Sequence, residues 1–482
     1  MVRGAGRPET PGPGHRGGVA GRAVATPGPG VSQGGSGRTR RLSQAVGRKW
    51  REVNSMERHM HIVVVGGGVV GMTTAYELNR RGHAVTVLER HSVAGNETSK
   101  ANAAQRSYGV VYPWADPAIV FKAIPWILKP DGPLKLRFPP SVETLKFMFA
   151  TLRYAWSPGL FGLNRRAMLR LGIHSRERFL ALEQELDLSF DGDHRGLLHL
   201  ASTREALGNY RVTHSLLNEL GIPSRLLTPE QVREAEPGMV GNGPLYGALS
   251  YDTDGTGDCH QFSRALAKAC ETKGVTVRYN VEAEKLIADG QQVSAITLRT
   301  DDGIMETLEA DAFVISAGCW SNHLVQPLGL ELPIYPVKGY SLTVPMIDPK
   351  RGPTSTIHDD NYKVVSTRLG NRLRATGFVE LADFNRDIPE ARLATIRKSV
   401  ESRFPGCADL DAAETWTGFR PMTPDGPAII GRGPRDNLYL NTGHGTFGWT
   451  LSAGSADVIA QVIEGEEPAI CLDAFRPGRF SE

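Results

Sequence analysis

Three glycines near residue 70 have the spacing of a phosphate-binding turn. Gly66, Gly68 and Gly71 follow the G-x-G-x-x-G pattern, directly after the apolar run 62–65. In such a turn the first glycine permits a sharp bend, the second lets the backbone approach a pyrophosphate, and the third allows close packing of helix on strand. A helix N-terminus that follows the turn favours the anion. The pattern therefore predicts a dinucleotide site.

The elements around the turn agree with this prediction. The sequence predicts a buried strand over 62–65, a helix over 70–80 and a second strand over 85–88, which ends in Glu89. A carboxylate there can accept both ribose hydroxyls and would repel a 2'-phosphate. We expect the cofactor to contact this unit through Val63, Val64, Val65, Gly66, Gly67, Gly68, Val69, Val70, Gly71, Glu89 and Arg90.

The glycine pattern does not separate NAD from FAD, and other segments favour a flavin. A second glycine turn, 441–449, leads into an Ala/Ser-rich helix predicted over 450–463. A buried strand over 312–315 runs into another glycine turn, and the loop 96–102 is polar. The flavin contacts expected from these segments are Ser99, Asn102, Ala317, Gly318, Gly443, Gly445 and Thr446.

At 482 residues the chain is long enough for two domains, but its first 59 residues differ from the rest. They hold eleven Lys/Arg and three acids, with little apolar periodicity, so we expect a disordered leader. It could be a targeting or nucleic-acid-binding arm, or sequence upstream of a natural start at Met60 or Met56. Without it, 44 basic and 49 acidic side chains give a charge of −5, and no nucleic-acid partner is expected.

The cysteines and the apolar segments indicate the cellular compartment and the possible contact with a membrane. Five widely spaced cysteines without C-x-x-C indicate no disulfide framework and no metal site, which is typical of a reducing, cytoplasmic compartment. No stretch of 18 apolar residues is present. Residues 114–161 mix aromatic, aliphatic and basic side chains. They are either amphipathic core helices or a peripheral contact with the inner face of the cell membrane.

The order of predicted elements indicates an α/β fold. We expect a Rossmann-like FAD-binding domain from 60–110, 245–320 and 420–472. Segments 111–244 and 321–419 should form an α+β substrate domain with a large mixed or antiparallel sheet, because 333–380 alternates in the manner of antiparallel strands. The chain would leave the nucleotide domain and return to it.

Several blocks together carry a resemblance to a known family. They are the 66–71 turn with Glu89, then 251–258, 316–321, 336–341 and the Gly-Phe-Arg-Pro block at 418–426. In this order they resemble the FAD-dependent D-amino acid dehydrogenases, relatives of D-amino acid oxidase, glycine oxidase and sarcosine oxidase. The resemblance covers residues 60–472. It implies oxidation of D-amino acids, D-alanine especially, to 2-oxo acids and ammonia, with electrons passed to a membrane quinone.

The resemblance also suggests site residues. Arg420 matches the arginine that binds the substrate carboxylate in the oxidase relatives, and a planar guanidinium can hold a carboxylate through two hydrogen bonds. Gly418 stands where the sarcosine-oxidase relatives attach flavin through cysteine, so FAD should be held non-covalently. Tyr340 could donate to the same carboxylate or belong to the core. His444 could be a base or a turn histidine bonded to the backbone.

Two other functions remain open from the sequence. An oxidase on the same scaffold would act on glycine, sarcosine or a D-amino acid and release peroxide. Alternatively, the flavin could be structural and the chain an electron-transfer subunit of a larger complex. Arg420 argues against a non-catalytic flavin, because such a subunit needs no group for a substrate carboxylate.

Overall fold

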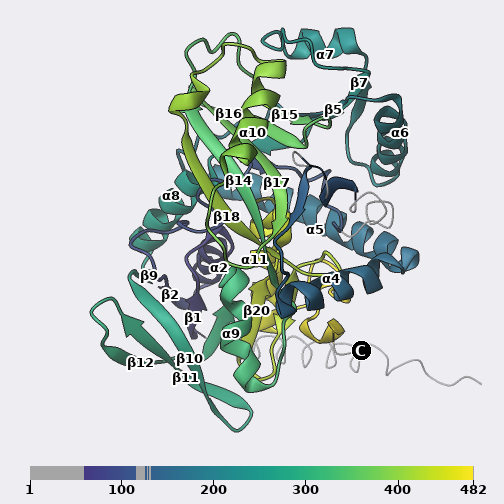
Figure 1. The fold of residues 1–482 in the computed structure, drawn as a ribbon. Coiled ribbons are helices and arrows are strands. Elements are labelled where there is room, and N and C mark those ends of the chain that lie inside the picture. The colour runs from purple at the N-terminus through teal and green to yellow at the C-terminus, as the bar shows by residue number, and fades with distance from the viewer. Residues whose placement is uncertain (1–58, 115–124, 128, 130–131, 481–482) are drawn as a thin grey trace, which may run out of the picture. The chain divides into compact units, whose positions relative to one another are not determined.

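The computed structural model describes residues 59–114, 125–127, 129 and 132–480. The expected leader lies outside these residues, except for His59. A six-stranded sheet in the order β19-β20-β13-β1-β2-β9 carries the first glycine turn (Figure 1). Its inner strands are parallel, and β19 at the edge is antiparallel to β20. The strands are β1 (His61–Val65), β2 (Ala84–Leu88), β9 (Thr276–Arg278), β13 (Ala312–Ile315), β19 (Ile429–Arg432) and β20 (Leu438–Thr442).

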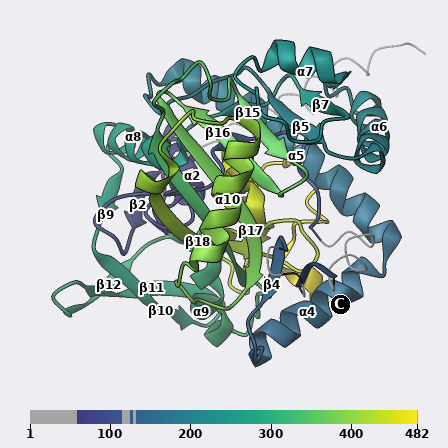
Figure 2. The same ribbon diagram turned by 45° about the horizontal axis from the view of Figure 1, so that its top comes forward.

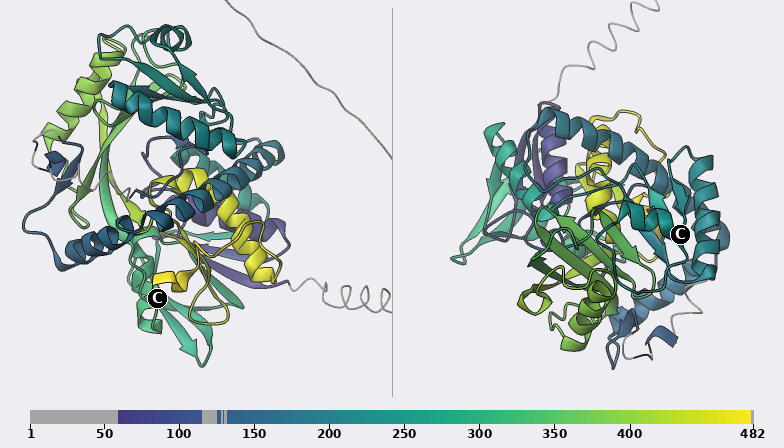
Figure 3. Two further views of the ribbon diagram at one scale, coloured as in Figure 1. Left: turned by 90° about the vertical axis from the view of Figure 1, so that its right-hand side faces the viewer. Right: turned by 90° about the horizontal axis from the view of Figure 1, so that it is seen from above.

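Both faces of this sheet are covered, which explains the continuous apolar run of β1. Ile62 and Val64 pack into a core with helices α2 (Val69–Arg80) and α11 (Gly448–Glu464). Val63 and Val65 face a second core beneath the antiparallel meander β10 (Val281–Asp289), β11 (Gln292–Thr300) and β12 (Met305–Glu309). The long helix α5 (Pro158–Glu185) runs beside α11 (Figure 3). The Rossmann-like fold is therefore confirmed.

A second, nine-stranded sheet has the order β18-β14-β17-β16-β15-β5-β7-β6, with β4 beside β17. Its neighbours are antiparallel except for the parallel pairs β15–β5 and β17–β4, which confirms the expected mixed sheet. Helix α10 (Glu390–Arg403) covers one face (Figure 2). The strands are β4 (Leu134–Leu136), β5 (Leu197–Ala201), β6 (Arg225–Leu227), β7 (Gly247–Tyr251), β14 (Tyr335–Pro345), β15 (Thr356–Asp359), β16 (Val364–Leu369), β17 (Arg372–Leu381) and β18 (Glu414–Met422).

The remaining elements connect the two sheets. Helix α8 (Cys259–Thr272) begins after Asp258, whose carboxylate accepts hydrogen bonds from the amides of His260 and Gln261 at 3.1 and 3.2 Å and so caps the helix. The other helices are α4 (Val142–Ala155), α6 (Arg204–Glu219), α7 (Pro229–Ala235) and α9 (Ser321–Val325). The short elements are β3 (Gln105–Arg106), β8 (Gly255–Thr256), η1 (Gly318–Trp320), η2 (Gln326–Leu328), η3 (Leu410–Ala412), η4 (Gly445–Phe447) and η5 (Pro477–Phe480).

Two expected domain limits do not match the sheets. The expected limit at 245 would place β7 in the nucleotide domain, yet this strand pairs with β5 and β6 of the large sheet. Likewise β18 continues past the limit at 420 to Met422 within the large sheet. An isolated apolar strand does not reveal its partners, because both sheets present similar buried positions. Among the described residues, no helix is long and apolar enough to cross a membrane.

Candidate active site

The first glycine turn has two positions at which any side chain would clash with the backbone. Gly66 has φ +108°, and a Cβ there would lie 2.7 Å from the carbonyl oxygen of Ser316. A Cβ on Gly71 would come within 1.8 Å of the carbonyl oxygen of Gly66, so α2 could not follow β1 so closely. By contrast, a Cβ on Gly68 would meet only the Ser99 hydroxyl, at 3.7 Å. The backbone at Gly68 is thus open toward the cavity, as a pyrophosphate site needs.

Glu89 directly follows β2, and its carboxylate stabilises the first glycine turn through a hydrogen bond. One carboxylate oxygen accepts a hydrogen bond from the Gly67 amide at 2.7 Å, and the other accepts one from the His91 amide at 2.9 Å. Burial raises the pKa of Glu89, while these amides oppose the rise. The next residue, Arg90, stacks on the ring of Trp320 at 3.7 Å and pairs with Glu97. Glu89 and Arg90 both line the cavity, on the side where a ribose and a base would extend.

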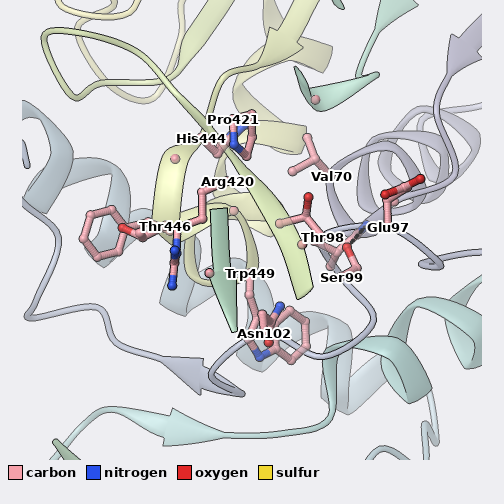
Figure 4. Close-up of a pocket in the computed structure, with 18 of the residues that line it drawn as sticks. Val70, Glu97, Thr98, Ser99, Asn102, Arg420, Pro421, His444, Thr446 and Trp449 are labelled. Atoms are coloured by element: carbon pink, nitrogen blue, oxygen red, sulfur yellow. Dashed lines mark hydrogen bonds between the residues drawn. The ribbon is translucent and has the colours of Figure 1, made fainter. Parts of the chain in front are cut away.

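The polar loop reaches the start of α2. The hydroxyl of Ser99 accepts a hydrogen bond from the Val69 amide at 3.1 Å, and Asn102 accepts one from the Ala104 amide at 2.9 Å. Both side chains line the cavity (Figure 4). Sequence reasoning missed Glu97 and Thr98 in the same loop. Nothing in their residue types distinguishes them from solvent-facing polar residues.

The other expected cofactor residues fall into two groups. Val63 and Val64 are fully buried in β1 and, with Gly67 and Gly71, shape the turn without lining the cavity. The rest line it: Val65, Gly66, Gly68, Val69, Val70, Ala317, Gly318, Gly443, Gly445 and Thr446. The structure therefore brings both glycine turns, which lie more than 370 residues apart in the chain, to one cavity.

The cavity has a volume of about 730 Å³, and several residues that line it have unpaired polar atoms. Five buried side-chain atoms along its nucleotide and flavin side have no hydrogen-bond partner among the described residues: Gln105 Nε2, Ser107 Oγ, Ser316 Oγ, Asn441 Oδ1 and Trp449 Nε1. Buried polar groups are normally paired, so these atoms fit a polar ligand of the size of FAD. No group of His, Cys, Asp and Glu in the described part of the chain could hold a metal.

Arg420 is a half-buried cation without a carboxylate partner among the described residues. Its Nη1 donates to the carbonyl oxygens of Phe378 and Lys338 at 3.1 and 3.3 Å, and no acid among the described residues pairs with it. Burial lowers the pKa of Arg420 to about 10, so the group remains charged at neutral pH. The side chain lines the cavity from β18 (Figure 4). A charge that is partly withdrawn from water is stabilised by a counter-ion, and a carboxylate from a ligand would supply one.

The packing around Gly418 is consistent with a cofactor that is not covalently attached at this position. A Cβ on Gly418 would lie 1.9 Å from the ring of Trp416, which covers the strand two residues earlier. A cysteine could not stand here without displacing that tryptophan. Non-covalent binding of FAD, expected from the sequence, agrees with this packing.

The structure does not bring Tyr340 to the cavity. Its side chain is fully buried in the core beneath α10, where the hydroxyl donates to Glu380 at 2.7 Å, and burial raises its pKa. Side chains alternate across a strand, so its neighbour Gly339 faces the cavity and Tyr340 faces the helix. The expected role in binding the substrate carboxylate is wrong. Of the two alternatives, the structure supports the core position.

His444 lines the cavity, and a hydrogen bond to helix α11 fixes the position of its ring. Its Nε2 and the Ser455 hydroxyl of α11 form a hydrogen bond of 3.1 Å, so the bond goes to a side chain and not to the backbone. Burial lowers the pKa of His444 to about 3, which keeps the ring neutral. This arrangement fixes the second glycine turn on α11.

Comparisons with known proteins give a matching family model and similar curated proteins. Residues 61–462 match the family model DAO, described as FAD dependent oxidoreductase. The chain is 43% identical over 412 residues to a D-amino acid dehydrogenase of Cereibacter sphaeroides, covering 85% of this chain and 93% of that protein. It is 42% identical over 422 residues to a D-amino acid dehydrogenase of Vibrio cholerae, covering 86% and 99%.

Solved structures share the fold. Glycine oxidase from Geobacillus kaustophilus aligns with a TM-score of 0.68 and 25% identity, over 87% of this chain and 98% of that chain. L-proline dehydrogenase from P. horikoshii aligns with a TM-score of 0.66 and 19% identity, over 87% and 97%.

Proposed function

This chain belongs to the DAO family of FAD-dependent oxidoreductases, and we propose that within this family it is a D-amino acid dehydrogenase. The reaction converts a zwitterionic D-amino acid, water and a quinone into a 2-oxo acid, ammonium and a hydroquinone. D-alanine is the favoured substrate. The observation that carries the proposal is the half-buried guanidinium of Arg420, which lines the cavity without a carboxylate partner among the described residues.

Arg420 binds the substrate carboxylate in this mechanism. A guanidinium can donate two parallel hydrogen bonds to a carboxylate, which fixes the position and the orientation of the ligand. Gly339 leaves the space for the guanidinium, and Trp416 covers the neighbouring strand position. A carboxylate held at two atoms and a side chain held by the cavity wall leave the amine and the α-hydrogen in fixed places. If the carboxylate and the side chain are held in the same positions, the amine and the α-hydrogen of the L-enantiomer are interchanged relative to the D-enantiomer. The cavity can therefore distinguish the two enantiomers.

FAD fits the cavity through residues that are already arranged for it. The turn 66–71 would hold the pyrophosphate, Glu89 the ribose, and the segment 443–446 with the start of α11 the flavin ring. When bound, FAD supplies the acceptor for the hydride that the α-carbon loses. The start of α11 also places a positive helix end at the cavity, which favours negative charge there.

A peripheral membrane contact is part of the proposal. On α4, Val142, Leu145 and Phe149 form one apolar stripe, with exposed fractions of 67%, 39% and 69%, and Phe138 and Trp156 flank it at 73% and 66%. The basic residues Arg137, Lys146 and Arg153 are exposed beside it. Apolar side chains with flanking cations suit an anionic bilayer surface such as the inner face of the cell membrane. Part of the expected segment 114–161 lies outside the described residues.

The test is anaerobic reduction of the FAD-loaded protein. D-alanine should bleach the flavin absorbance near 450 nm and L-alanine should not. The variant Arg420→Lys should retain FAD but lose about 10²-fold in kcat/KM for D-alanine, because lysine cannot form the two parallel hydrogen bonds. Arg432→Lys, an exposed position on β19, is the matched control and should behave as the native protein.

The outcomes separate the proposed dehydrogenase from its alternatives. Fast reoxidation by a quinone analogue and slow reoxidation by air would support it. Fast reoxidation by air with peroxide release would instead indicate an oxidase, a function that the likeness to glycine oxidase favours as the second candidate. Absence of bleaching by any amino acid would contradict catalysis and leave a structural flavin.

A further inference from the structure

Two histidines at the far end of the cavity have no role in the function described so far. His199 on β5 and His358 on β15 are direct neighbours in the parallel register of these strands. Their rings stack, with centroids 4.4 Å apart and an angle of 23° between the planes. Both residues line the cavity. Their strands β5 and β15 lie side by side in Figure 1. Neither side chain was singled out by the sequence, because the two histidines lie 159 positions apart.

Both rings have unsatisfied hydrogen-bonding atoms. Nε2 of His199 and Nδ1 of His358 are buried and have no hydrogen-bond partner in the described part of the chain. Burial lowers the pKa of His358 to about 4, and burial, His358 and Lys363 hold the pKa of His199 well below its usual value. The pair is therefore neutral at pH 7, and each ring carries one N–H and one lone pair.

The charged groups around the pair already compensate each other. Lys363 forms an ion pair with Asp360, and the nearby Asp359 pairs with Arg403. The two imidazoles therefore face a site without an uncompensated charge, where an uncharged ligand with hydrogen-bond acceptors fits better than an ion.

Aromatic side chains surround the same end of the cavity. The ring of Tyr210 lies 6.1 Å from that of His199, and the rings of Tyr112 and Phe447 lie 6.0 Å apart. All of them line the cavity, and Phe447 lies within the second glycine turn. Aromatic surface thus extends from the expected flavin position to the histidine pair. A flat ring with polar oxygens suits such a lining.

The bound amino acid does not account for the pair. Arg420 is on β18, and strands β14, β17 and β16 separate it from β15. Adjacent strands are about 4.8 Å apart, so β15 lies ~19 Å from β18 along the sheet. A small amino acid such as alanine, held by its carboxylate at Arg420, does not extend that far. The amino acid would therefore leave the histidine pair without a ligand.

We propose that His199 and His358 bind the ring carbonyl groups of the quinone that accepts the electrons. This inference rests on the proposed function. The quinone takes up two electrons and two protons, the same number that the zwitterionic amino acid loses on oxidation to its protonated imine, and becomes a hydroquinone. Hydrolysis of that imine then gives the 2-oxo acid and ammonium.

The experiment measures the two half-reactions separately on the FAD-loaded full chain. The variants are His199→Leu and His358→Leu, which remove the ring N–H groups. His358→Gln retains a donor. The control is His214→Leu on α6, outside the cavity lining, where the histidine bonds to Ser224. Stopped-flow absorbance gives the rate of flavin reduction by D-alanine, and then the rate of reoxidation by a short-chain ubiquinone analogue or by ferricyanide.

We expect the Leu variants to keep reduction by D-alanine and reoxidation by ferricyanide within about twofold. The quinone concentration for half-maximal reoxidation should rise about tenfold, because each Leu variant loses one hydrogen bond to the ligand. His358→Gln should recover part of this loss. Unchanged quinone dependence in both Leu variants would overturn the proposal. So would slower reduction that depends on the amino acid side chain, because the pair would then serve the substrate.

A binding measurement separates this inference from the proposed dehydrogenase activity. Quenching of protein fluorescence by the ubiquinone analogue gives its Kd for the oxidised protein without turnover. If no D-amino acid reduces the flavin, the dehydrogenase proposal fails, yet a tenfold weaker Kd in His199→Leu would still support the quinone site. Equal Kd values in the native protein and both Leu variants would contradict the site whatever the substrate is.

Discussion

The guanidinium of Arg420 occupies the space that Gly339 leaves on the neighbouring strand. A Cβ on Gly339 would lie 2.4 Å from Nη1 of Arg420 and 2.6 Å from its Cζ. Gly339 pairs with Gly418, two residues before Arg420, so the sheet surface beneath the guanidinium has no side chain from either glycine. The cation can therefore lie flat against the strands and keep its remaining donors for a ligand.

Gly339→Ala should disturb substrate binding and leave the cofactor in place. The added methyl group displaces the guanidinium, so kcat/KM for D-alanine should fall by ~10- to 100-fold, the loss of one or two charge-assisted hydrogen bonds. The flavin content should remain that of the native protein. Steady-state kinetics with a quinone analogue measure the change. Native kinetics in this variant would show that Arg420 does not need the space over Gly339.

Gly71→Ala should abolish FAD binding. The new Cβ would meet the carbonyl oxygen of Gly66 at 1.8 Å, so α2 must move away from β1 and the turn loses its shape. Gly162→Ala in α5 is the control, because nothing lies within 4 Å of its Cβ. We expect the apparent Kd for FAD to rise by more than about 100-fold in Gly71→Ala alone. Stoichiometric flavin in purified Gly71→Ala would contradict the assigned role of this glycine.

Asp254 should make the protein less stable as the pH rises. Its carboxyl group is fully buried and accepts hydrogen bonds from the amides of Tyr108 and Gly109, but its Oδ2 has no partner among the described residues. Burial raises the pKa of Asp254 from 3.8 to about 8. Between these values the folded protein binds a proton that the unfolded chain releases. The free energy of unfolding therefore falls with rising pH, by up to ~1.4 kcal/mol per unit from this group.

The variant Asp254→Asn tests this sign. Asparagine keeps the acceptor oxygen and does not ionise, so its free energy of unfolding should exceed that of the native protein increasingly from pH 5 to pH 8. Urea unfolding at saturating FAD and at several pH values gives the difference between the two proteins. A difference that is constant with pH would show that Asp254 ionises normally in the folded state.

The apolar stripe on α4 should carry the membrane contact. Replacing Val142 and Phe149 together by serine removes two of its most exposed side chains, while Phe147, on the opposite face, keeps its stacking on Trp114 and Tyr335. We expect binding to vesicles of phosphatidylcholine and phosphatidylglycerol to fall at least about tenfold in a flotation assay. Val212→Ser on α6, 70% exposed, is the matched control and should bind as the native protein. Equal flotation of all three proteins would exclude this stripe.

Local sequence was sufficient to predict the nucleotide half of the site. The turn 66–71, the capping of α8 by Asp258 and the position of Glu89 are set by backbone conformations and contacts within a few dozen residues. Such features depend on residue type and spacing, which the sequence states directly. Arg420 was also a candidate from the sequence, but its unpaired state depends on which acids lie near it in space.

The face that each strand residue presents was decided only by the tertiary structure. Side chains alternate along a strand, so a shift of one residue in register exchanges the cavity face for the core face. That is why Gly339 reaches the cavity while Tyr340 packs beneath α10. The same pairing brings His199 beside His358, a contact set by the register of β5 and β15. The sequence by itself determined the cofactor turn and the fold class. The arrangement of distant strands determined which side chains meet in the cavity, because only folding closes the long loops between them.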